Sequence, residues 1–373
     1  FVVVVVSAMG KETDRLLKLT SGLDEYKNSD DIASLLSAGE QISSSLFSIL
    51  LNKNNIKGKS FQGWQLPIYT DLSSYNSHIF KIETQHIKKS LKNNEVPVVS
   101  GFQGINKLNR ITTLGRGGSD TTAVAISATF GAERCDIFTD VEGVFTTDPR
   151  IVKNARKLDV IAYEEMLELS SLGAKVLHTR SVELAMRYGV RLQVLSSFEE
   201  KNGTLVCRED KMLESKIISG ISCSKEEAKI TLTGVDDKPG VAAAIFGPLS
   251  ESGINVDMII QNISENNSTD LTFSCPSSQV LEAEEAIKMA SKKKEISFKS
   301  HIIDTNVAKV SLVGIGMRSH TGIAKKMFEA LANENINILV ISTSEIKISI
   351  LVEQKYMELA VQTLHDAFEL EKP

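Results

Sequence analysis

A glycine-rich segment, Thr112–Thr122, carries the residues of this chain that are best suited to binding an anion. It reads Thr-Thr-Leu-Gly-Arg-Gly-Gly-Ser-Asp-Thr-Thr, and adjacent glycines let a backbone turn sharply and approach a ligand closely. Arg116 adds a planar guanidinium that can grip a carboxylate or a phosphate through two hydrogen bonds. Ser119 and Asp120 are residue types that begin helices, and the N–H groups at the start of a helix favour negative charge. The segment therefore predicts an anion site, although a plain turn before a capped helix has the same local pattern.

Other segments carry side chains suited to a charged substrate. Glu40 lies in Ala38–Ser43 within an expected helix over 32–51, where a solvated carboxylate is the alternative interpretation. Residues 139–150 read Thr-Asp-Val-Glu-Gly-Val-Phe-Thr-Thr-Asp-Pro-Arg. That mixture of acidic, aromatic and cationic side chains suits a nucleoside triphosphate, unless the segment is a surface turn closed by Asp-Pro. Lys175 is either a point charge for phosphate or an ordinary solvated lysine.

The elements that would position these residues alternate between strands and helices. Strands are expected over 1–6, 95–100, 135–140 and 190–196, with helices between them. This order predicts an α/β fold, with a mostly parallel sheet sandwiched by helices. Ligands of such sheets bind beyond the carboxyl ends of the strands, which is where the turns at 7–10 and 101–104 lie.

Composition limits the class of partner. The chain has 373 residues and a net charge of -5, which argues against a nucleic acid or an anionic membrane as its partner. Its 4 cysteines form no C-x-x-C pair, so we expect a reducing, cytoplasmic location and neither disulfides nor a zinc site. The histidines show no metal-ligand spacing, and no metal-binding residues are predicted. The apolar run over 1–6 is too short to span a bilayer.

The last part of the chain repeats itself. Residues 228–234 match 308–314, and five further residues recur at a constant offset. They are Gly240, Phe246, Leu249, Ile254 and Asn255, which match Gly322, Phe328, Leu331, Ile336 and Asn337. Each copy has the order of strand, turn, helix and strand, followed by a further strand and helix. We therefore expect two ferredoxin-like units.

With these segments placed, nearly the whole chain resembles the aspartate kinase (aspartokinase) family, of the monofunctional type. The resemblance rests on Ser7–Gly10, Ala38–Ser43, Thr112–Thr122, Thr139–Arg150 and Asp237–Gly240. It implies an amino-acid-kinase fold with two C-terminal ferredoxin-like ACT domains. The implied boundaries are a catalytic domain over 1–200, a linker over 201–216, a first ACT domain over 228–303, and a second ACT domain made of 217–227 plus 304–373.

The resemblance also implies an activity and its regulation. ATP would phosphorylate the side-chain carboxylate of L-aspartate with Mg²⁺ present, in the first step of the lysine, threonine and methionine branch. The ACT domains imply feedback by lysine, threonine or both, and a homo-oligomer formed through them. A catalytically inactive amino-acid sensor and another amino-acid kinase remain as alternatives.

Residue roles follow from the resemblance position by position. The catalytic residues would be Asp120 and Lys175, and the aspartate would be bound by Thr13, Glu40, Arg116, Gly117 and Ser119. ATP would be bound by Thr139, Asp140, Val144, Phe145, Thr146, Thr147, Asp148, Pro149, Arg150 and Lys175. The effector residues would be Asp237, Asn255, Val256, Asp257, Gln261 and Ser264 in the first copy. In the second copy they would be Asn337, Ile338 and the segment Ser342–Glu345, which includes Thr343.

Two positions depart from the family pattern. The family has an earlier strand that ends in Lys-Phe/Tyr-Gly-Gly, and this sequence begins after it. We expect that the start of the sequence is missing, and the alternative is an inactive protein. Thr321 stands where the family usually has a proline, opposite Pro239 of the first copy, so the turn before the second pocket should be less rigid.

Overall fold

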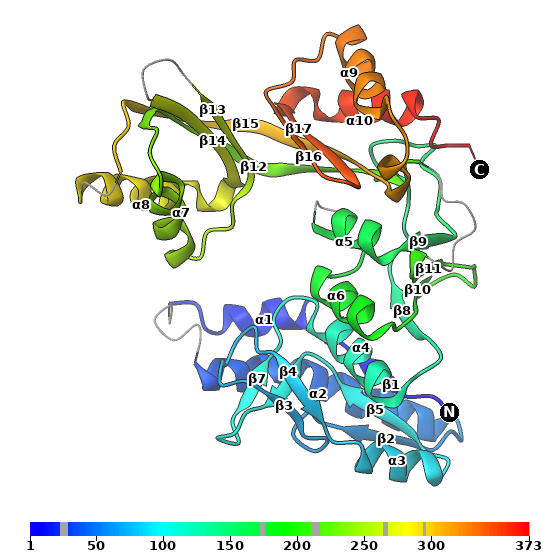
Figure 1. The fold of residues 1–373 in the computed structure, drawn as a ribbon. Coiled ribbons are helices and arrows are strands. Elements are labelled where there is room, and N and C mark those ends of the chain that lie inside the picture. Colours follow the sequence, from blue (N-terminus) through cyan, green and yellow to red (C-terminus); the bar gives the residue numbers. More distant parts are fainter. Residues whose placement is uncertain (23–28, 172–175, 210–216, 264–267, 294–295, 373) are drawn as a thin grey trace. The chain divides into compact units, whose positions relative to one another are not determined.

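The computed structural model describes residues 1–22, 29–171, 176–209, 217–263, 268–293 and 296–372 (Figure 1). The chain divides into two compact units. Unit 1 comprises Phe1–Val144, Asp159–Ser170 and Lys175–Met212, and unit 2 comprises Phe145–Leu158, Ser171–Ala174 and Leu213–Pro373. None of the helices in these described ranges combines the length and the hydropathy needed to cross a bilayer.

A parallel sheet in the order β1-β5-β2 forms the centre of the first part of unit 1. Its strands are β1 (Val4–Val6), β5 (Val96–Ser100) and β2 (Gly58–Phe61). Successive side chains of a strand point to opposite faces, and β5 shows this directly. Val99 packs into one hydrophobic core, whereas the Ser100 hydroxyl on the opposite face contacts the Ser44 hydroxyl at 2.8 Å.

Helices cover both faces of this sheet, as expected for parallel strands. On the Ser100 face lies α2 (Asp30–Lys53), which begins with the Ser29 hydroxyl accepting the Ile32 N–H at 3.3 Å. On the Val99 face, α3 (Gln85–Lys92) and α4 (Gly118–Phe130) share one hydrophobic core with the sheet. The short helix α1 (Glu12–Lys18) follows β1 and packs against α2.

Two further sheets complete unit 1. One has the order β4-β3-β6-β7, formed by β3 (Ile68–Thr70), β4 (Ile79–Ile82), β6 (Gln103–Ile105) and β7 (Ile111–Thr113). The other has the order β8-β10-β11-β9, formed by β8 (Cys135–Thr139), β9 (Val160–Ala162), β10 (Leu192–Ser196) and β11 (Thr204–Cys207). Near the second sheet in sequence are α5 (Tyr163–Ser171) and α6 (Thr179–Tyr188).

The α/β architecture predicted from the sequence is confirmed, with the strands divided among three small sheets rather than joined in one. One detail differs from the expected domain boundaries. Thr204–Cys207, inside the predicted linker, forms β11, which pairs with β10 and β9. The charged residues on either side of this strand favoured the prediction of a linker, but Thr204, Val206 and Cys207 are buried. The remaining boundaries stay a prediction.

Unit 2 contains a six-stranded sheet in the order β13-β14-β12-β15-β17-β16. The strands are β12 (Gly220–Asp236), β13 (Asp257–Ile263), β14 (Ser268–Pro276), β15 (Ser300–Val313), β16 (Val340–Thr343) and β17 (Lys347–Glu353). Neighbouring strands of this sheet pair antiparallel. The long strand β12 joins the two sequence repeats, because its first residues pair with the end of β15 and its later residues pair with β14.

Each repeat has its own hydrophobic core beneath a pair of helices (Figure 1). α7 (Val241–Glu251) and α8 (Val280–Lys292) contact each other over one core, and α9 (Ile323–Asn333) and α10 (Met357–Ala367) contact each other over the other. Two helices packed beside antiparallel strands in each repeat agree with the expected ferredoxin-like units.

The segment Phe145–Leu158 belongs to unit 2, although it lies between two parts of unit 1 in sequence. Val152 is buried in the same core as α9 and α10. The Thr146 carbonyl accepts the Ile221 N–H at 2.7 Å, and the Gln362 amide donates to the Ile151 carbonyl at 3.0 Å. This segment, which includes most of the residues predicted to bind ATP, is therefore held by the second repeat.

A cluster of three charged groups, of which Lys309 and Glu227 are buried, joins the repeats. The Lys309 ammonium of β15 lies 2.7 Å from a carboxylate oxygen of Glu227 in β12 and 2.9 Å from one of Asp257 in β13. Burial alone would lower the pKa of Lys309, but the two carboxylates outweigh it and the pKa is raised. The ammonium therefore stays charged within the sheet and compensates the carboxylates beside it.

Replacement of Lys309 should destabilise unit 2, because it would leave Glu227 buried without a counter-charge. Lys309 is 6% exposed. We expect Lys309→Met to lower the free energy of unfolding by about 3–5 kcal/mol, measured by denaturant unfolding of the full chain. The control is Lys225→Met, whose side chain is 48% exposed and pairs with Glu358, and it should cost less than about 1 kcal/mol. Equal effects of the two variants would contradict a stabilising role of the cluster.

Candidate active site

The glycine-rich segment forms a tight bend that leads into α4. Gly115 and Gly117 have φ angles of 78° and 64°, a left-handed conformation that glycine adopts without strain. Gly115 also has no space for a side chain, because a Cβ there would lie 1.7 Å from the Asn76 amide oxygen. Helix α4 begins at Gly118, so its first N–H groups lie next to Arg116, which is exposed.

The bend is fixed against the turn that follows β5. A Cβ on Gly101 would lie 2.7 Å from the Ser119 hydroxyl oxygen, so the turn and the start of α4 are in close contact. Two hydrogen bonds hold the same turn: the Phe102 N–H donates to the Thr122 hydroxyl at 3.2 Å, and the Leu114 N–H donates to the Phe102 carbonyl at 2.8 Å. Phe102 has a φ of 66°, which is uncommon for a bulky residue and indicates a constrained turn.

Glu40 is buried in α2 beneath the turn that follows β1. Its side chain is only 2% exposed, and Oε1 accepts the Ala8 N–H at 3.0 Å. Helix and turn touch here, because a Cβ on the preceding Gly39 would lie 2.8 Å from Ala8 Cβ. Oε2 has no hydrogen-bond partner among the residues that the structure describes. Burial, opposed by the Ala8 N–H, raises the pKa of Glu40 to about 7.

The end of β5 connects Glu40 to the bend. The Ser100 hydroxyl donates to the Glu40 carbonyl at 3.2 Å. The next residue, Gly101, is the one that touches Ser119. The structure thus brings together Glu40, Ser119 and the turns after two neighbouring parallel strands, at the carboxyl edge where α/β sheets bind ligands.

Asp120 is a second carboxylate with a perturbed pKa in this region. Burial, opposed by a hydrogen bond from the His178 N–H, raises the pKa of Asp120 to about 6. His178 lies beside the bend, since a Cβ on Gly117 would come within 2.2 Å of His178 Cβ. The guanidinium of Arg180 donates to the Leu114 carbonyl at 2.7 Å. The start of α6 therefore positions the bend.

Sequence reasoning missed His178 and Arg180. His178 precedes α6 and Arg180 is its second residue. The apolar face of this helix is a local signal that a helix begins here, but nothing in the sequence indicates that its start contacts a bend some sixty residues earlier.

The other predicted residues of unit 1 are placed as follows. Thr13 is half-buried in α1. At the end of β8, the Thr139 hydroxyl donates to the Asp140 carboxylate at 3.1 Å. The Val144 N–H donates to the Thr204 hydroxyl at 2.8 Å. Lys175 lies outside the described residues.

The predicted ATP-binding residues Phe145–Arg150 belong to unit 2. Thr146 and Thr147 are buried there. Arg150 is exposed, and its guanidinium pairs with Asp148 at 2.7 Å. This pair holds the pKa of the Asp148 carboxyl below its usual range.

The geometry of unit 1 suits a small zwitterion with an extra carboxylate. A buried glutamate with an oxygen that has no hydrogen-bond partner can accept an ammonium group. Because its pKa is raised, the glutamate is only partly ionised at neutral pH until such a cation binds. The guanidinium of Arg116 and the N–H groups at the start of α4 can bind carboxylates. Groups for both charges of an amino acid thus occur in unit 1, and Ser100 and Gly101 at the end of β5 connect Glu40 to the bend.

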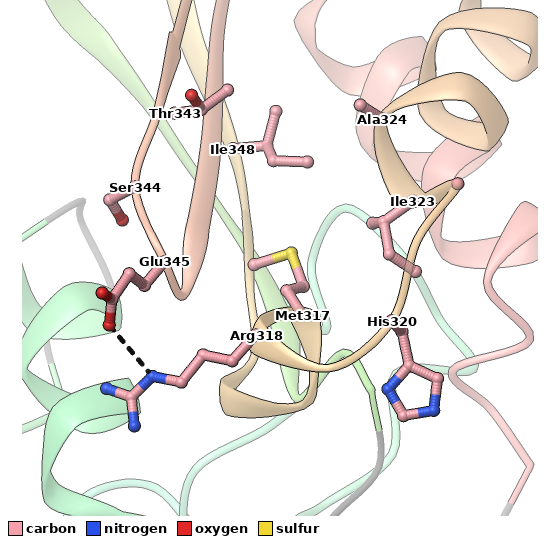
Figure 2. Close-up of a pocket in the computed structure, with 10 residues that line it drawn as sticks. Met317, Arg318, His320, Ile323, Ala324, Thr343, Ser344, Glu345 and Ile348 are labelled. Carbon is pink, nitrogen blue, oxygen red and sulfur yellow. Dashed lines mark ion pairs between the residues drawn. The ribbon is translucent and has the colours of Figure 1, made fainter.

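Unit 2 contains a pocket between the start of α9 and the turn from β16 to β17 (Figure 2). Its volume is about 490 Å³. Figure 2 shows Met317, Ile323 and Ile348 directed toward its middle, with Arg318 and Glu345 paired at one side at 3.4 Å. Of the residues predicted for the second copy, Thr343, Ser344 and Glu345 line this pocket, whereas Asn337 and Ile338 are not among its lining residues.

Of the residues predicted for the effector site of the first copy, some are exposed to solvent, whereas others pack into the core or form an ion pair. Asp237, Asn255 and Gln261 are exposed, whereas Val256 packs against the hydrophobic core of that repeat. The carboxylate of Asp257 is paired with Lys309, and this ammonium outweighs burial and lowers the pKa of Asp257. Ser264 lies outside the described residues. An effector that approached Asp257 would therefore meet an ion pair rather than a free carboxylate.

Comparison with known proteins agrees with this architecture. The amino acid kinase family model matches residues 1–196, and ACT domain models match residues 229–288 and 310–368. The chain is 50% identical over 374 residues to the aspartokinase of Pseudomonas aeruginosa, with 100% of this chain and 90% of that protein covered. It is 46% identical over 376 residues to the aspartokinase of Helicobacter pylori, with 100% and 92% covered.

Solved structures are similar as well. E. coli aspartokinase III in complex with aspartate and ADP has a TM-score of 0.77 at 28% identity, covering 96% of this chain and 81% of that one. The same enzyme in complex with lysine and aspartate has a TM-score of 0.73 at 28% identity, with the same coverage. A kinase domain followed by two ACT domains, matched along its full length by relatives of this kind, shows that the chain belongs to the aspartate kinase family.

Proposed function

We propose that this chain transfers the γ-phosphoryl group of ATP to the side-chain carboxylate of L-aspartate, giving 4-phospho-L-aspartate and ADP. The observation that supports the proposal is the buried Glu40 carboxylate, one oxygen of which has no partner among the described residues. Its backbone carbonyl accepts the Ser100 hydroxyl, and the next residue, Gly101, is in close contact with Ser119 of the bend. The names of the relatives support the reaction, and the complex of E. coli aspartokinase III with aspartate and ADP supports both substrates.

In this proposal the aspartate is held by complementary charges. Glu40 Oε2 accepts the ammonium group of the substrate, and Thr13 contributes a hydroxyl. Arg116, with the backbone of Gly117 and the side chain of Ser119, binds the carboxylates. Arginine suits this purpose better than lysine does, because its planar fork binds a carboxylate through two parallel hydrogen bonds.

The chemical step needs little acid–base catalysis, because a carboxylate is already a competent nucleophile. One of its oxygens forms the new bond to the γ-phosphorus as the bond from phosphorus to the ADP oxygen breaks. Catalysis then depends on positioning and on compensating the phosphate charge. Asp120 orients the attacking group, and Lys175 with the N–H groups of the bend stabilises the phosphoryl oxygens.

The nucleotide is proposed to bind Thr139, Asp140, Val144 and the segment Phe145–Arg150. Mg²⁺ prefers oxygen ligands and is often held by one carboxylate together with the phosphates of the substrate. The exposed Asp140 carboxylate at the end of β8 fits that donor chemistry. When bound, Mg²⁺ would supply positive charge at the phosphates.

The proposed biological role is the first step of the lysine, threonine and methionine branch in the cytoplasm. The two ACT domains are proposed to bind lysine, threonine or both, and to assemble the chain into a homo-oligomer. The pocket lined by Thr343, Arg318 and Glu345 supports an amino-acid effector, because it offers both charges and an apolar side. The complex of E. coli aspartokinase III with lysine supports the choice of effector.

Loss of the guanidinium at the bend should weaken aspartate binding. We expect Arg116→Ala to raise the aspartate KM by about tenfold or more, a loss of roughly 1.4 kcal/mol, with a smaller effect on the ATP KM. The control is Arg110→Ala, because Arg110 is partly exposed and pairs with Asp30 and Asp31. Steady-state assays of ADP formation measure both variants. An unchanged aspartate KM in Arg116→Ala would contradict the assignment, and no ADP formation by the unsubstituted protein would favour an inactive sensor.

The raised pKa of Glu40 predicts a pH dependence of aspartate use. Glu40 must be ionised to accept an ammonium group, and its pKa is about 7. As the pH falls below that value, the ionised fraction of the free enzyme drops, so kcat/KM for aspartate should fall by about tenfold per pH unit. Glu40→Gln should have a low kcat/KM at pH 8 and lose this dependence. Glu83→Gln, which removes a partly exposed carboxylate paired with Lys81, should leave the profile unchanged. A profile without a decline near pH 7 would contradict the role of Glu40.

Feedback should depend on exposed polar side chains of the first ACT domain. We expect Asn255→Ala and Gln261→Ala to lose inhibition by lysine or threonine while kcat stays within about twofold, since neither residue lies in unit 1. Calorimetry with each amino acid, alone and together, should show the matching loss of binding. Gln279→Ala, at the start of α8, serves as the control. Full sensitivity of both variants would place the effector elsewhere, with the pocket of Thr343 as the next candidate.

A further inference from the structure

Three side chains with metal-binding atoms lie together at the end of α10 in unit 2. They are His365 and Asp366 of the helix and Glu371 of the turn after it, and their nearest ligand atoms all lie within 4.8 Å of one another. His365 is completely buried, whereas the two carboxylates are exposed. The cluster is thus open to solvent on its acidic side and is backed by a rigid imidazole.

The imidazole of His365 has one nitrogen in use and one without a partner. Nε2 lies 3.0 Å from the Thr146 hydroxyl. Nδ1 is buried and has no hydrogen-bond partner within the described ranges, and the nearest Glu371 carboxylate oxygen is 3.9 Å away. Buried polar atoms nearly always have a partner. Nδ1 of His365 thus lies near carboxylate oxygens, but at distances longer than a hydrogen bond. This is the arrangement of a metal site without its metal ion.

We propose that Nδ1 of His365 and the carboxylates of Asp366 and Glu371 form a binding site for a divalent transition-metal ion, with Zn²⁺ the best fit. One imidazole and two carboxylates are ligands that Zn²⁺ accepts, with water completing a tetrahedral shell. Ligand atoms of a tetrahedral Zn²⁺ shell lie about 3.4 Å apart, so the exposed carboxylates must rotate inward to close the shell. Glu371, whose side chain is 37% exposed, has room for that rotation.

The charges around the cluster allow a cation. The imidazole ring binds metals in its neutral form. The cationic group facing the ring is Arg156, whose guanidinium donates to the carbonyls of Leu370 and Lys157, each at 3.4 Å. The Lys372 ammonium, which pairs with Glu369, also interacts with Glu371, so a metal ion would compete with these two cations for the carboxylates.

Metal binding would also fix how His365 holds Thr146. A metal on Nδ1 leaves the ring proton on Nε2, which then donates to the Thr146 hydroxyl. The Thr146 hydroxyl also accepts a hydrogen bond from the backbone N–H of Arg156 at 3.0 Å. Thr146 lies in the segment Phe145–Leu158, so the ion would act on the position of that segment within unit 2.

The test uses the full chain, without nucleotide, titrated with Zn²⁺ by calorimetry and with Co²⁺ by visible absorption. We expect one site in the micromolar range or tighter, with the spectrum of tetrahedral Co²⁺. Asp366→Asn and Glu371→Gln should each weaken Zn²⁺ binding by about tenfold or more, and both residues are exposed, so the fold should survive. Glu369→Gln is the matched control, because this exposed carboxylate of the same turn pairs with Lys372 instead, and it should bind Zn²⁺ as the unsubstituted protein does.

A spectroscopic readout identifies the nitrogen. With ¹⁵N-labelled histidine, Zn²⁺ should shift the Nδ1 resonance of His365 while the proton stays on Nε2. The proposal is overturned if no Zn²⁺ binds, if both carboxylate variants bind within twofold of the unsubstituted protein, or if the bound metal is lost only with Asp120→Asn in unit 1.

Discussion

The burial of one carboxylate, Glu40, is the constraint on which unit 1 depends. Its pKa rises from 4.5 to about 7, which at 1.36 kcal/mol per unit corresponds to about 3 kcal/mol of unfavourable free energy when the group is ionised in the fold. Because the folded pKa lies above the unfolded one, this cost is absent below pH 4.5 and is complete above pH 7. The backbone N–H of Ala8 offsets part of it and binds the turn after β1 to α2.

Three glycines allow the close contacts of this part of unit 1. Gly39 must lack a side chain for α2 to meet Ala8, and Gly101 must lack one for the β5 turn to meet Ser119. Gly117 is required where the bend passes His178. These close approaches bring two strand ends and two helix starts together around one small volume. An alanine at any of the three positions would open that volume, even where the backbone angle is permitted.

The sequence predicted the two kinds of unit because their signals are local. The β-branched run of β1, the glycine-rich bend before α4 and the constant offset between the two repeats are each visible within short windows. The family resemblance then supplied roles that periodicity could not. What the sequence could not show are contacts made at a distance along the chain: the hydrogen bond from His178 to Asp120, and the ion pair that occupies Asp257. Both join residues more than fifty positions apart, and no local pattern records them.

The strand β11 and the segment Phe145–Leu158 show a further limit of sequence reasoning. The residues on either side of Thr204–Cys207 are charged, which led to the prediction of a linker. The segment instead forms β11 between β9 and β10, and Thr204, Val206 and Cys207 are buried. The predicted ATP-binding residues Phe145–Arg150 belong to unit 2, and the residues that follow them, Ile151 and Val152, pack in or against the core of the second repeat. From the order of residues alone, a residue is expected to belong to the domain of its sequence neighbours. In the folded protein it belongs to the domain whose core it packs into.

That assignment matters for the proposed regulation. Allosteric coupling requires that an effector changes contacts which differ between two states of the protein. The chain crosses from unit 1 to unit 2 between Val144, whose N–H is held by Thr204, and Thr146, whose hydroxyl and carbonyl are held by His365 and Ile221. A shift in the core beneath α9 and α10 would therefore act on Thr146 directly, while Val144 stays anchored by Thr204. Under the proposed nucleotide site, the segment restrained at Val144 in unit 1 and at Thr146 in unit 2 would carry such a shift to the bound ligand.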